Sequence, residues 1–114
     1  MIFNQTLVRI RAGTRTTRGG DVELDWSPAA VTRTLITDVS VQPNFQREDE
    51  AGQTPTRATG YRVISAPGTT PDITALDRLE YRGALHAVSG EVAYWPDPHG
   101  RDHIELAMTG WKGA

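Results

Sequence analysis

Residues 6–26, TLVRIRAGTRTTRGGDVELDW, carry the pattern that decides the fold class. Apolar side chains alternate with charged ones on both sides of a glycine-rich centre, Gly13–Gly20: Val8, Ile10 and Ala12 before it, and Val22, Leu24 and Trp26 after it. A period of two residues is typical of a strand with one buried face. Two such runs around a turn-forming segment predict an antiparallel β-hairpin.

The charged residues of these two runs predict a register for the hairpin. Apolar side chains should face apolar ones and opposite charges should face each other, because a slip of one residue would turn a whole apolar set to solvent. These conditions centre the turn on Thr17. The predicted pairs are Val8 with Trp26, Arg9 with Asp25, Ile10 with Leu24, and Arg11 with Glu23.

The rest of the chain repeats the strand pattern at short intervals. Residues 35–41 are rich in β-branched side chains, which favours a strand. The alternation of apolar and polar positions is interrupted between Leu35 and Ile36, and this predicts a bulge or a late start of the strand there. Residues 73–77 are ambiguous and fit one helical turn. Further alternations cover residues 61–66, 79–82, 85–88, 92–94 and 104–108, and Gly83 marks a tight hairpin. About seven short strands joined by Gly/Pro-rich turns predict an all-β domain over residues 1–114, either a small antiparallel β-barrel or a small sandwich.

One long polar segment interrupts this series. Residues 42–59, QPNFQREDEAGQTPTRAT, show neither a helical stripe nor a strand alternation, so we expect one long loop between two strands, at residues 43–58. Loops longer than roughly 12–15 residues are uncommon in compact domains and are usually functional or disordered. This loop is therefore the first candidate for a functional segment.

Composition excludes several classes of protein. The 114 residues carry a formal net charge of −2, whereas a protein that clamps duplex DNA needs a strongly basic surface. The chain has no cysteine, which excludes disulfides and thiolate metal sites. No apolar run approaches the roughly 20 residues of a membrane-spanning helix. We expect a protein made in a cytosol, without a membrane partner.

The residues that could perform chemistry do not form a convincing catalytic set. His99 and His103 with Asp97 could be forced into a metal site, but they flank a turn, and solvated side chains explain them better. We therefore expect no enzyme, no metal and no cofactor. Arg15 and Arg18, at the tip of the first hairpin, fit a solvated or subunit-facing role better than base recognition. Trp111, near the C-terminus, is a candidate interface anchor.

Four stretches together resemble the head-to-tail stopper (head-closure) proteins of long-tailed actinobacteriophages. They are FNQTLVRIRAGTRTTRGGDVELDW (residues 3–26), DVSVQP (38–43), YRVISAPG (61–68) and DRLEYRGALHAVSGEVAYWPDPHGRDHIEL (77–106). The resemblance covers nearly the whole chain and rests on the order and spacing of the strands. It implies a small β-barrel that belongs to the virion neck.

What the resemblance implies about assembly is specific. Copies of the chain, twelve by resemblance, form a ring below the portal and adaptor proteins, retain packaged double-stranded DNA, and offer a docking surface to the tail terminator or tail tube protein. The loop between two central strands, Asn44 to Arg57 here, projects into the axial channel. Its channel-facing candidates are Asn44, Gln46, Arg47, Glu48, Asp49, Glu50, Gln53 and Arg57. This mixed, net acidic set favours contacts with neighbouring loops over strong DNA binding.

Two other interpretations remain open at the level of sequence. The chain could occupy another position in the neck, as an adaptor or tail terminator, because the strand pattern does not distinguish these. It could instead be a free oligonucleotide-binding barrel whose aromatic side chains stack on bases. The net charge of −2 disfavours this second alternative.

Overall fold

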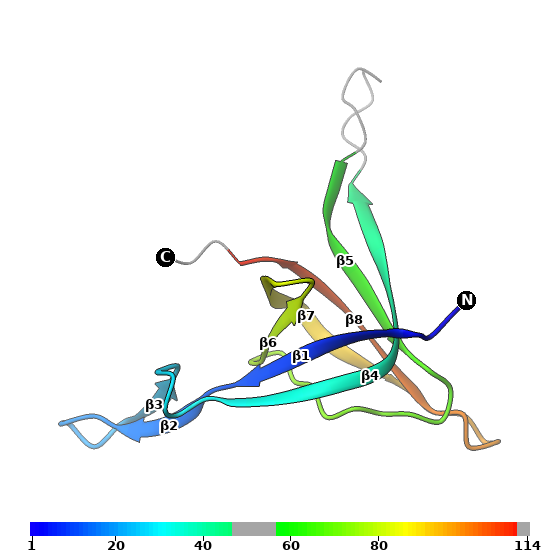
Figure 1. Cartoon of the computed structure of the whole chain (residues 1–114). Helices are drawn as coiled ribbons and strands as arrows, with labels where there is room; N and C mark the ends of the chain where they lie inside the picture. Colours follow the sequence, from blue (N-terminus) through cyan, green and yellow to red (C-terminus); the bar gives the residue numbers. More distant parts are fainter. Residues whose placement is uncertain (47–56, 112–114) are drawn as a thin grey trace.

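A computed structural model describes residues 1–46 and 57–111, which form an all-β domain. The strands are β1 (Gln5–Arg11), β2 (Gly13–Thr16), β3 (Val22–Asp25), β4 (Thr32–Gln46), β5 (Arg57–Ser65), β6 (Arg78–Tyr81), β7 (Ala84–Trp95) and β8 (His103–Gly110). Six of them close into an antiparallel barrel in the order β1-β4-β5-β8-β7-β6, and β2 pairs only with β3. The expected fold class, a small antiparallel barrel, is confirmed (Figure 1).

The barrel interior is filled by apolar side chains that mostly come from the later predicted alternations, whereas the predicted apolar face of the first two runs is wrong: Leu7 rather than Val8 joins the core, and Val22 and Leu24 are exposed. In β8, Ile104, Leu106 and Met108 are buried, as expected for inward-facing positions. Ile73, from the connection between β5 and β6, joins the same core. The other members are Leu7, Ile36, Val39, Val41, Val63, Leu79 and Tyr81. Within the described residues, no helix is long and apolar enough to cross a membrane.

Strand β4 bends sharply and belongs to two ladders. Its first part pairs with β1, where Leu7 faces Ile36 and Gln5 faces Val39, and its second part pairs with β5 from Val39 onward. The extra residue lies between Ile36 and Val39, and Asp38 there has a φ of 59°. The predicted bulge therefore exists two residues later than expected. Of the two adjacent apolar residues Leu35 and Ile36, Ile36 faces the barrel interior: Ile36 is 7% exposed, whereas Leu35 is 63% exposed.

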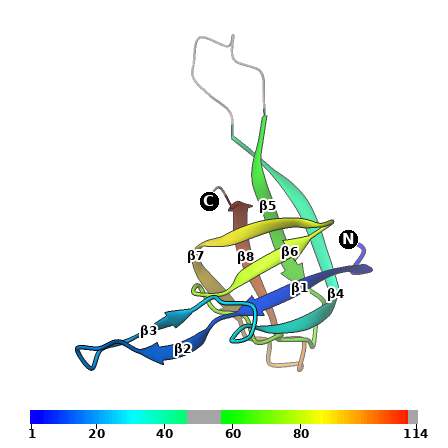
Figure 2. The same ribbon diagram turned by 60° about the vertical axis from the view of Figure 1, so that its left-hand side comes forward.

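The predicted register of the first hairpin is wrong. Ile10 faces Arg33 of β4 and Arg78 of β6, not Leu24. The hairpin is formed by β2 and β3, with Gly13 opposite Asp25 and Thr16 opposite Val22, so its centre lies at Gly19 rather than Thr17. The alternating first run enters the barrel, and a separate, shorter hairpin projects from the barrel end (Figure 2).

The ends of the long segment are also more regular than predicted. Strand β4 continues to Gln46 and β5 begins at Arg57, and these two residues face each other in the ladder. Pro43 is tolerated in β4 because only β5 pairs with the strand there, so its missing N–H breaks no second ladder. This arm of β4 and β5 rises from the barrel in Figure 1. The predicted loop of residues 43–58 is thus strand at both ends, and residues 47–56 lie outside the described residues.

Two shorter predictions have opposite outcomes. The hairpin at Gly83 is confirmed, since Arg82 and Gly83 link β6 to β7 with φ values of 53° and 78°. Positive φ at both central residues is the mark of a type I′ turn, whose twist suits a two-residue hairpin. The predicted helical turn at residues 73–77 is wrong. That segment holds a single hydrogen-bonded β-turn, closed by the Asp77 N–H donating to the Thr74 carbonyl, and no helix.

The projecting hairpins make the molecule extended for its size. Its radius of gyration is 16.5 Å, whereas a compact domain of this length would have about 13 Å. The barrel accounts for the compact part. Two arms, the β2–β3 hairpin and the β4–β5 arm, account for the difference.

Gly60 permits the close approach of β5 to β8. A Cβ atom at this position would lie 2.2 Å from the Met108 carbonyl oxygen, which is backbone and cannot move aside cheaply. Replacing Gly60 by alanine should therefore lower the free energy of unfolding by about 1–3 kcal/mol through overpacking. Urea denaturation measures this loss. The matched control is Gly110→Ala in β8, because nothing lies within 4 Å of a Cβ there. Equal stabilities of the two variants would contradict the prediction.

Candidate functional site

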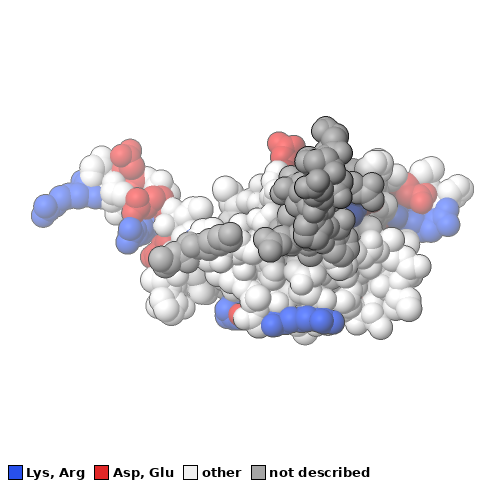
Figure 3. All heavy atoms as spheres, turned by 90° about the horizontal axis from the view of Figure 1, so that it is seen from above, with Lys and Arg blue, Asp and Glu red and all other residues white. Residues whose placement is uncertain are grey.

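The β2–β3 hairpin is the most exposed regular element. Val22 and Leu24 are 69% and 41% exposed, and they lie on one face of the hairpin with Thr14 and Thr16 opposite them. On the other face, Arg15 forms an ion pair with Glu23, with 2.6 Å between Nη2 and Oε1. Figure 3 shows the hairpin standing away from a largely uncharged barrel surface and carrying side chains of both signs. An isolated two-stranded hairpin is at best marginally stable in water. Its exposed apolar face is therefore a candidate interaction surface.

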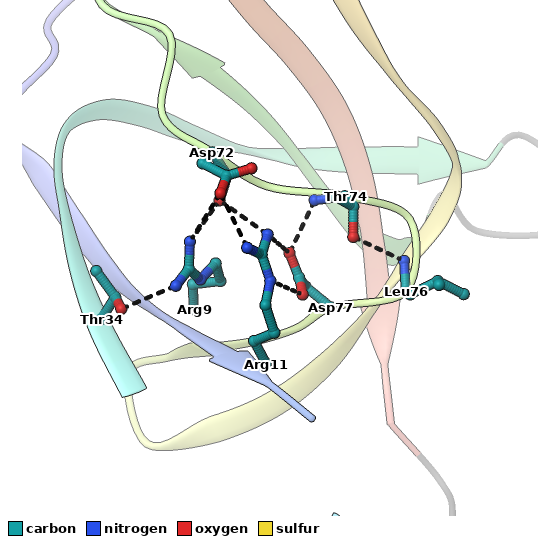
Figure 4. Close-up of polar contacts among 7 residues, drawn as sticks. All are labelled: Arg9, Arg11, Thr34, Asp72, Thr74, Leu76 and Asp77. Atoms are coloured by element: carbon teal, nitrogen blue, oxygen red, sulfur yellow. Dashed lines mark hydrogen bonds and ion pairs between the residues drawn. The ribbon is translucent and has the colours of Figure 1, made fainter. Parts of the chain in front are cut away.

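Arg9 and Arg11 anchor the connection between β5 and β6 to β1 (Figure 4). Arg11 donates from Nε and Nη2 to the two carboxylate oxygens of Asp77, both at 2.9 Å, and from Nη1 to Asp72 at 2.9 Å. Arg9 donates to the Asp72 carbonyl at 2.9 Å and to the Thr34 hydroxyl at 3.0 Å. The predicted pairs Arg9–Asp25 and Arg11–Glu23 are therefore wrong. These two arginines have structural partners more than 60 residues away.

The network shifts the acidities of its members. Burial of Asp77 opposes ionisation, yet hydrogen bonds from Arg11 and from the Thr74 N–H outweigh it and hold the pKa of Asp77 below its usual value. The Arg11 hydrogen bond likewise lowers the pKa of Asp72. Hydrogen bonds to Asp77 and Asp72 raise the pKa of Arg11. All three side chains are therefore charged at neutral pH.

This network predicts an acid-sensitive contribution to stability. A carboxyl group with a lowered folded pKa stabilises the native state above its unfolded pKa, about 3.9 for aspartate, and the contribution is lost as the pH falls through the folded value. Asp77→Asn should lower the free energy of unfolding at pH 7 by about 1–3 kcal/mol. It should also flatten the decline of stability between about pH 5 and pH 2.

Denaturant titrations across this pH range measure both effects. The matched control is Asp21→Asn on the exposed hairpin, where the carboxylate has no ion pair within the described chain. A pH dependence in Asp77→Asn as steep as that of the wild type would refute the assignment.

A second cluster joins three distant parts of the chain. The guanidinium carbon of Arg78 lies 3.7 Å from the centroid of the Trp26 ring and 4.0 Å from that of Trp111. Trp26 follows β3, Arg78 begins β6, and the Trp111 N–H bonds the Leu85 carbonyl at 2.9 Å. Burial lowers the pKa of Arg78. Trp111, the expected interface anchor, is 39% exposed and has one ring face occupied within its own chain.

Removing the charge of Arg78 should loosen this cluster. A cation–π contact contributes about 0.5–2 kcal/mol, so Arg78→Met, which keeps most of the side-chain volume, should lower stability by about 1–3 kcal/mol for two contacts. Urea denaturation followed by tryptophan fluorescence measures the loss. Arg101→Met, at an arginine whose side chain is 64% exposed, is the control and should change stability by less than about 0.5 kcal/mol. Equal effects of the two variants would count against the cluster.

A groove of about 260 Å³ opens on the side of the barrel formed by β5, β8 and β7. It arises at an irregularity in β7, where Ser89 faces Ala107 but Ala93 faces Glu105, so extra residues around Gly90 leave the ladder. Gly90 has a φ of 77°. The lining includes Arg62, Glu91, Ala93, Trp95, Glu105, Leu106 and Ala107. Glycine within a strand pattern is a known sign of a bulge, and this was the one sequence signal for the groove.

The residues predicted to line a channel are placed only in part. Asn44 is exposed in the β4–β5 arm, and Gln46 and Arg57 are paired positions at its end. Arg47, Glu48, Asp49, Glu50 and Gln53 lie outside the described residues. Arg15 and Arg18 lie on the β2–β3 hairpin, as predicted for a tip, although Arg15 belongs to β2 itself. The described members of the two sets lie on two separate arms.

The histidines have ordinary partners. His103 Nε2 lies 2.9 Å from Glu105, and His86 is buried with Nδ1 3.0 Å from the Ala84 carbonyl oxygen. Asp97 accepts a hydrogen bond from the His99 backbone N–H at 2.7 Å. Over residues 1–46 and 57–111, no group of three potential His, Asp or Glu ligands is arranged to hold a metal ion.

No protein-family model matches the chain, and a search of the curated proteins finds no match to its sequence.

Proposed function

We propose that the protein is a structural virion protein of the phage neck. Copies form a ring below the portal and adaptor proteins, retain packaged DNA in the axial channel, and present the docking surface for the tail terminator or tail tube protein. The protein is made in the bacterial host cytoplasm and performs no catalysis. The proposal rests on the resemblance of the strand-bearing stretches to head-to-tail stopper proteins.

The structural observation that supports the proposal best is the pair of arms on a closed barrel. A closed barrel has no free strand edges for pairing with other chains. The β2–β3 hairpin and the β4–β5 arm instead extend beyond the compact body, and Val22 and Leu24 are exposed on the first of them. Exposed apolar side chains on a projecting element suit assembly rather than a solitary protein.

The alternative of a free oligonucleotide-binding barrel is less well supported. Nucleic-acid affinity depends on arginines and lysines that are available to phosphates. Carboxylates already pair with Arg9, Arg11, Arg15, Arg33, Arg62 and Arg101. Arg78 is enclosed between two tryptophans. Little unpaired positive charge is left on the described surface.

Reconstruction of the neck of a phage that encodes this chain tests the proposal directly. We expect a ring of barrels immediately below the portal and adaptor, with the β4–β5 arm directed toward the axis. Density for the chain in the adaptor or tail-terminator ring would transfer the assignment to that position. Virions without the chain would overturn the proposal.

Shortening the β4–β5 arm tests DNA retention. Gln46 and Arg57 face each other, so an Asn-Gly turn can replace residues 47–56 and close the ladder as a two-residue hairpin. The barrel should keep its thermal stability, whereas particles built with this variant should lose packaged DNA, measured as nuclease-protected genome per particle. The control is Arg82→Asn, which places the same Asn-Gly pair at the existing β6–β7 turn. Full DNA retention in particles with the shortened arm would exclude a gating role.

A further inference from the structure

The hairpin and the groove lie on opposite sides of the barrel. In the closed order β1-β4-β5-β8-β7-β6, β1 stands three places from β8, so the two strands face each other across the core. The β2–β3 hairpin continues from β1, whereas the groove is lined by β5, β8 and β7, with Asn44 of the β4–β5 arm at its edge. Figure 1 shows the hairpin and the β7–β8 connection at opposite sides of the molecule. One chain therefore cannot place its own hairpin in its own groove.

The groove has the chemistry of a site for a guanidinium group. Glu91 is exposed and has no ion pair among residues 1–46 and 57–111. Trp95 is 51% exposed, and its ring is stacked on His103 with an interplanar angle of 7° and 6.2 Å between centroids. A carboxylate beside an aromatic ring binds arginine through a charge-assisted hydrogen bond and a cation–π contact. Ala93, Leu106 and Ala107 add apolar lining next to these two side chains.

The hairpin carries the complementary groups. Arg18 is exposed in the turn between β2 and β3, and within the described chain no carboxylate pairs with it. Val22 and Leu24 follow it on one exposed face. From Gly13 to Arg18 in the turn, strand geometry gives a reach of about 17 Å. That length exceeds what a side chain alone could span.

We propose that the β2–β3 hairpin of one copy docks in the groove between β5, β8 and β7 of the next copy. Arg18 meets Glu91 and the free face of Trp95, while Val22 and Leu24 cover the apolar lining. This inference rests on the proposed ring and identifies the contact that builds it. Because the two surfaces differ, the contact is heterologous, and repetition around an axis generates a closed ring rather than a symmetric dimer.

A pair of single-cysteine variants tests the contact without background, because the chain contains no cysteine. Arg18→Cys and Glu91→Cys change exposed residues without ion pairs, so both variants should keep the wild-type melting temperature. After treatment with a bismaleimide crosslinker whose arm matches the reach of an arginine–glutamate pair, which a direct disulfide cannot span, neither variant alone should form a dimer, and their mixture should give a crosslinked dimer that grows no further. A chain with both cysteines should give a ladder of covalent oligomers, in purified protein at associating concentrations and in phage particles.

The controls separate this contact from other modes of association. Arg82→Cys, at the tip of the β6–β7 hairpin, should not link to Glu91→Cys. A dimer formed by Arg18→Cys alone would indicate a symmetric contact and overturn the proposal. If the chain is found as a ring in the neck but its double-cysteine form gives no ladder, this contact is wrong and the proposed ring still stands. Absence of the chain from the neck would remove the proposed function first.

Charge reversal gives an independent measurement. Arg18→Glu should weaken self-association at least tenfold in sedimentation experiments, and adding Glu91→Arg to the same chain should restore most of it. Arg82→Glu should leave association unchanged. If adding Glu91→Arg does not restore association, and Arg82→Glu weakens association as much as Arg18→Glu does, then net charge rather than this pair controls association.

Discussion

The bend in β4 is the constraint on which the rest of the structure depends. Val39 is fully buried and faces both Gln5 of β1 and Ser65 of β5, so one strand belongs to two ladders at this point. Because β1 begins at Gln5, its backbone offers no partner to β4 beyond Val39. The Gln5 side chain supplies the next acceptor instead, and its Oε1 accepts a hydrogen bond from the Val41 N–H at 2.6 Å. The bulge before Val39 gives the strand the curvature that a small barrel requires. The same bend directs the second half of β4 outward as an arm.

Much of this fold could be predicted from alternation alone. The inward residues of β8 and of β6, and the hairpin at Gly83, are where a period of two places them, because burial on one face is a local property of a strand. Partner choice is not local. Arg9 and Arg11 had suitable acids nearby in the sequence, but Asp72 and Asp77 bind them instead, because the closed barrel brings the β5–β6 connection beside β1. The two alternating runs are therefore not paired with each other, because β1 pairs with β4 and β6 and β3 pairs with β2.

The candidate sites were predictable to a smaller degree. The arginines and glycines of the first hairpin predict that it is exposed. Its position outside the barrel could not be predicted, because that depends on which strands close the barrel. The Trp26–Arg78–Trp111 cluster unites the end of β3, the start of β6 and the residue after β8, which no spacing in the sequence connects. The groove depends on the bulge at Gly90 and on which strand lies beside it. Such sites come from topology, whereas alternation specifies only faces.

The proposed docking would tie the order of the hairpin to association. Within a single chain the β2–β3 ladder has two strands and exposes Val22 and Leu24, so little burial offsets the conformational entropy lost on its formation. Docking in a neighbouring copy would bury those side chains, and the free energy of that contact would then also stabilise the hairpin. Arg78, which lies between Trp26 and Trp111, holds the root of the hairpin on the barrel. A ring built from such contacts gains order as it closes, because the last copy both docks a hairpin and receives one.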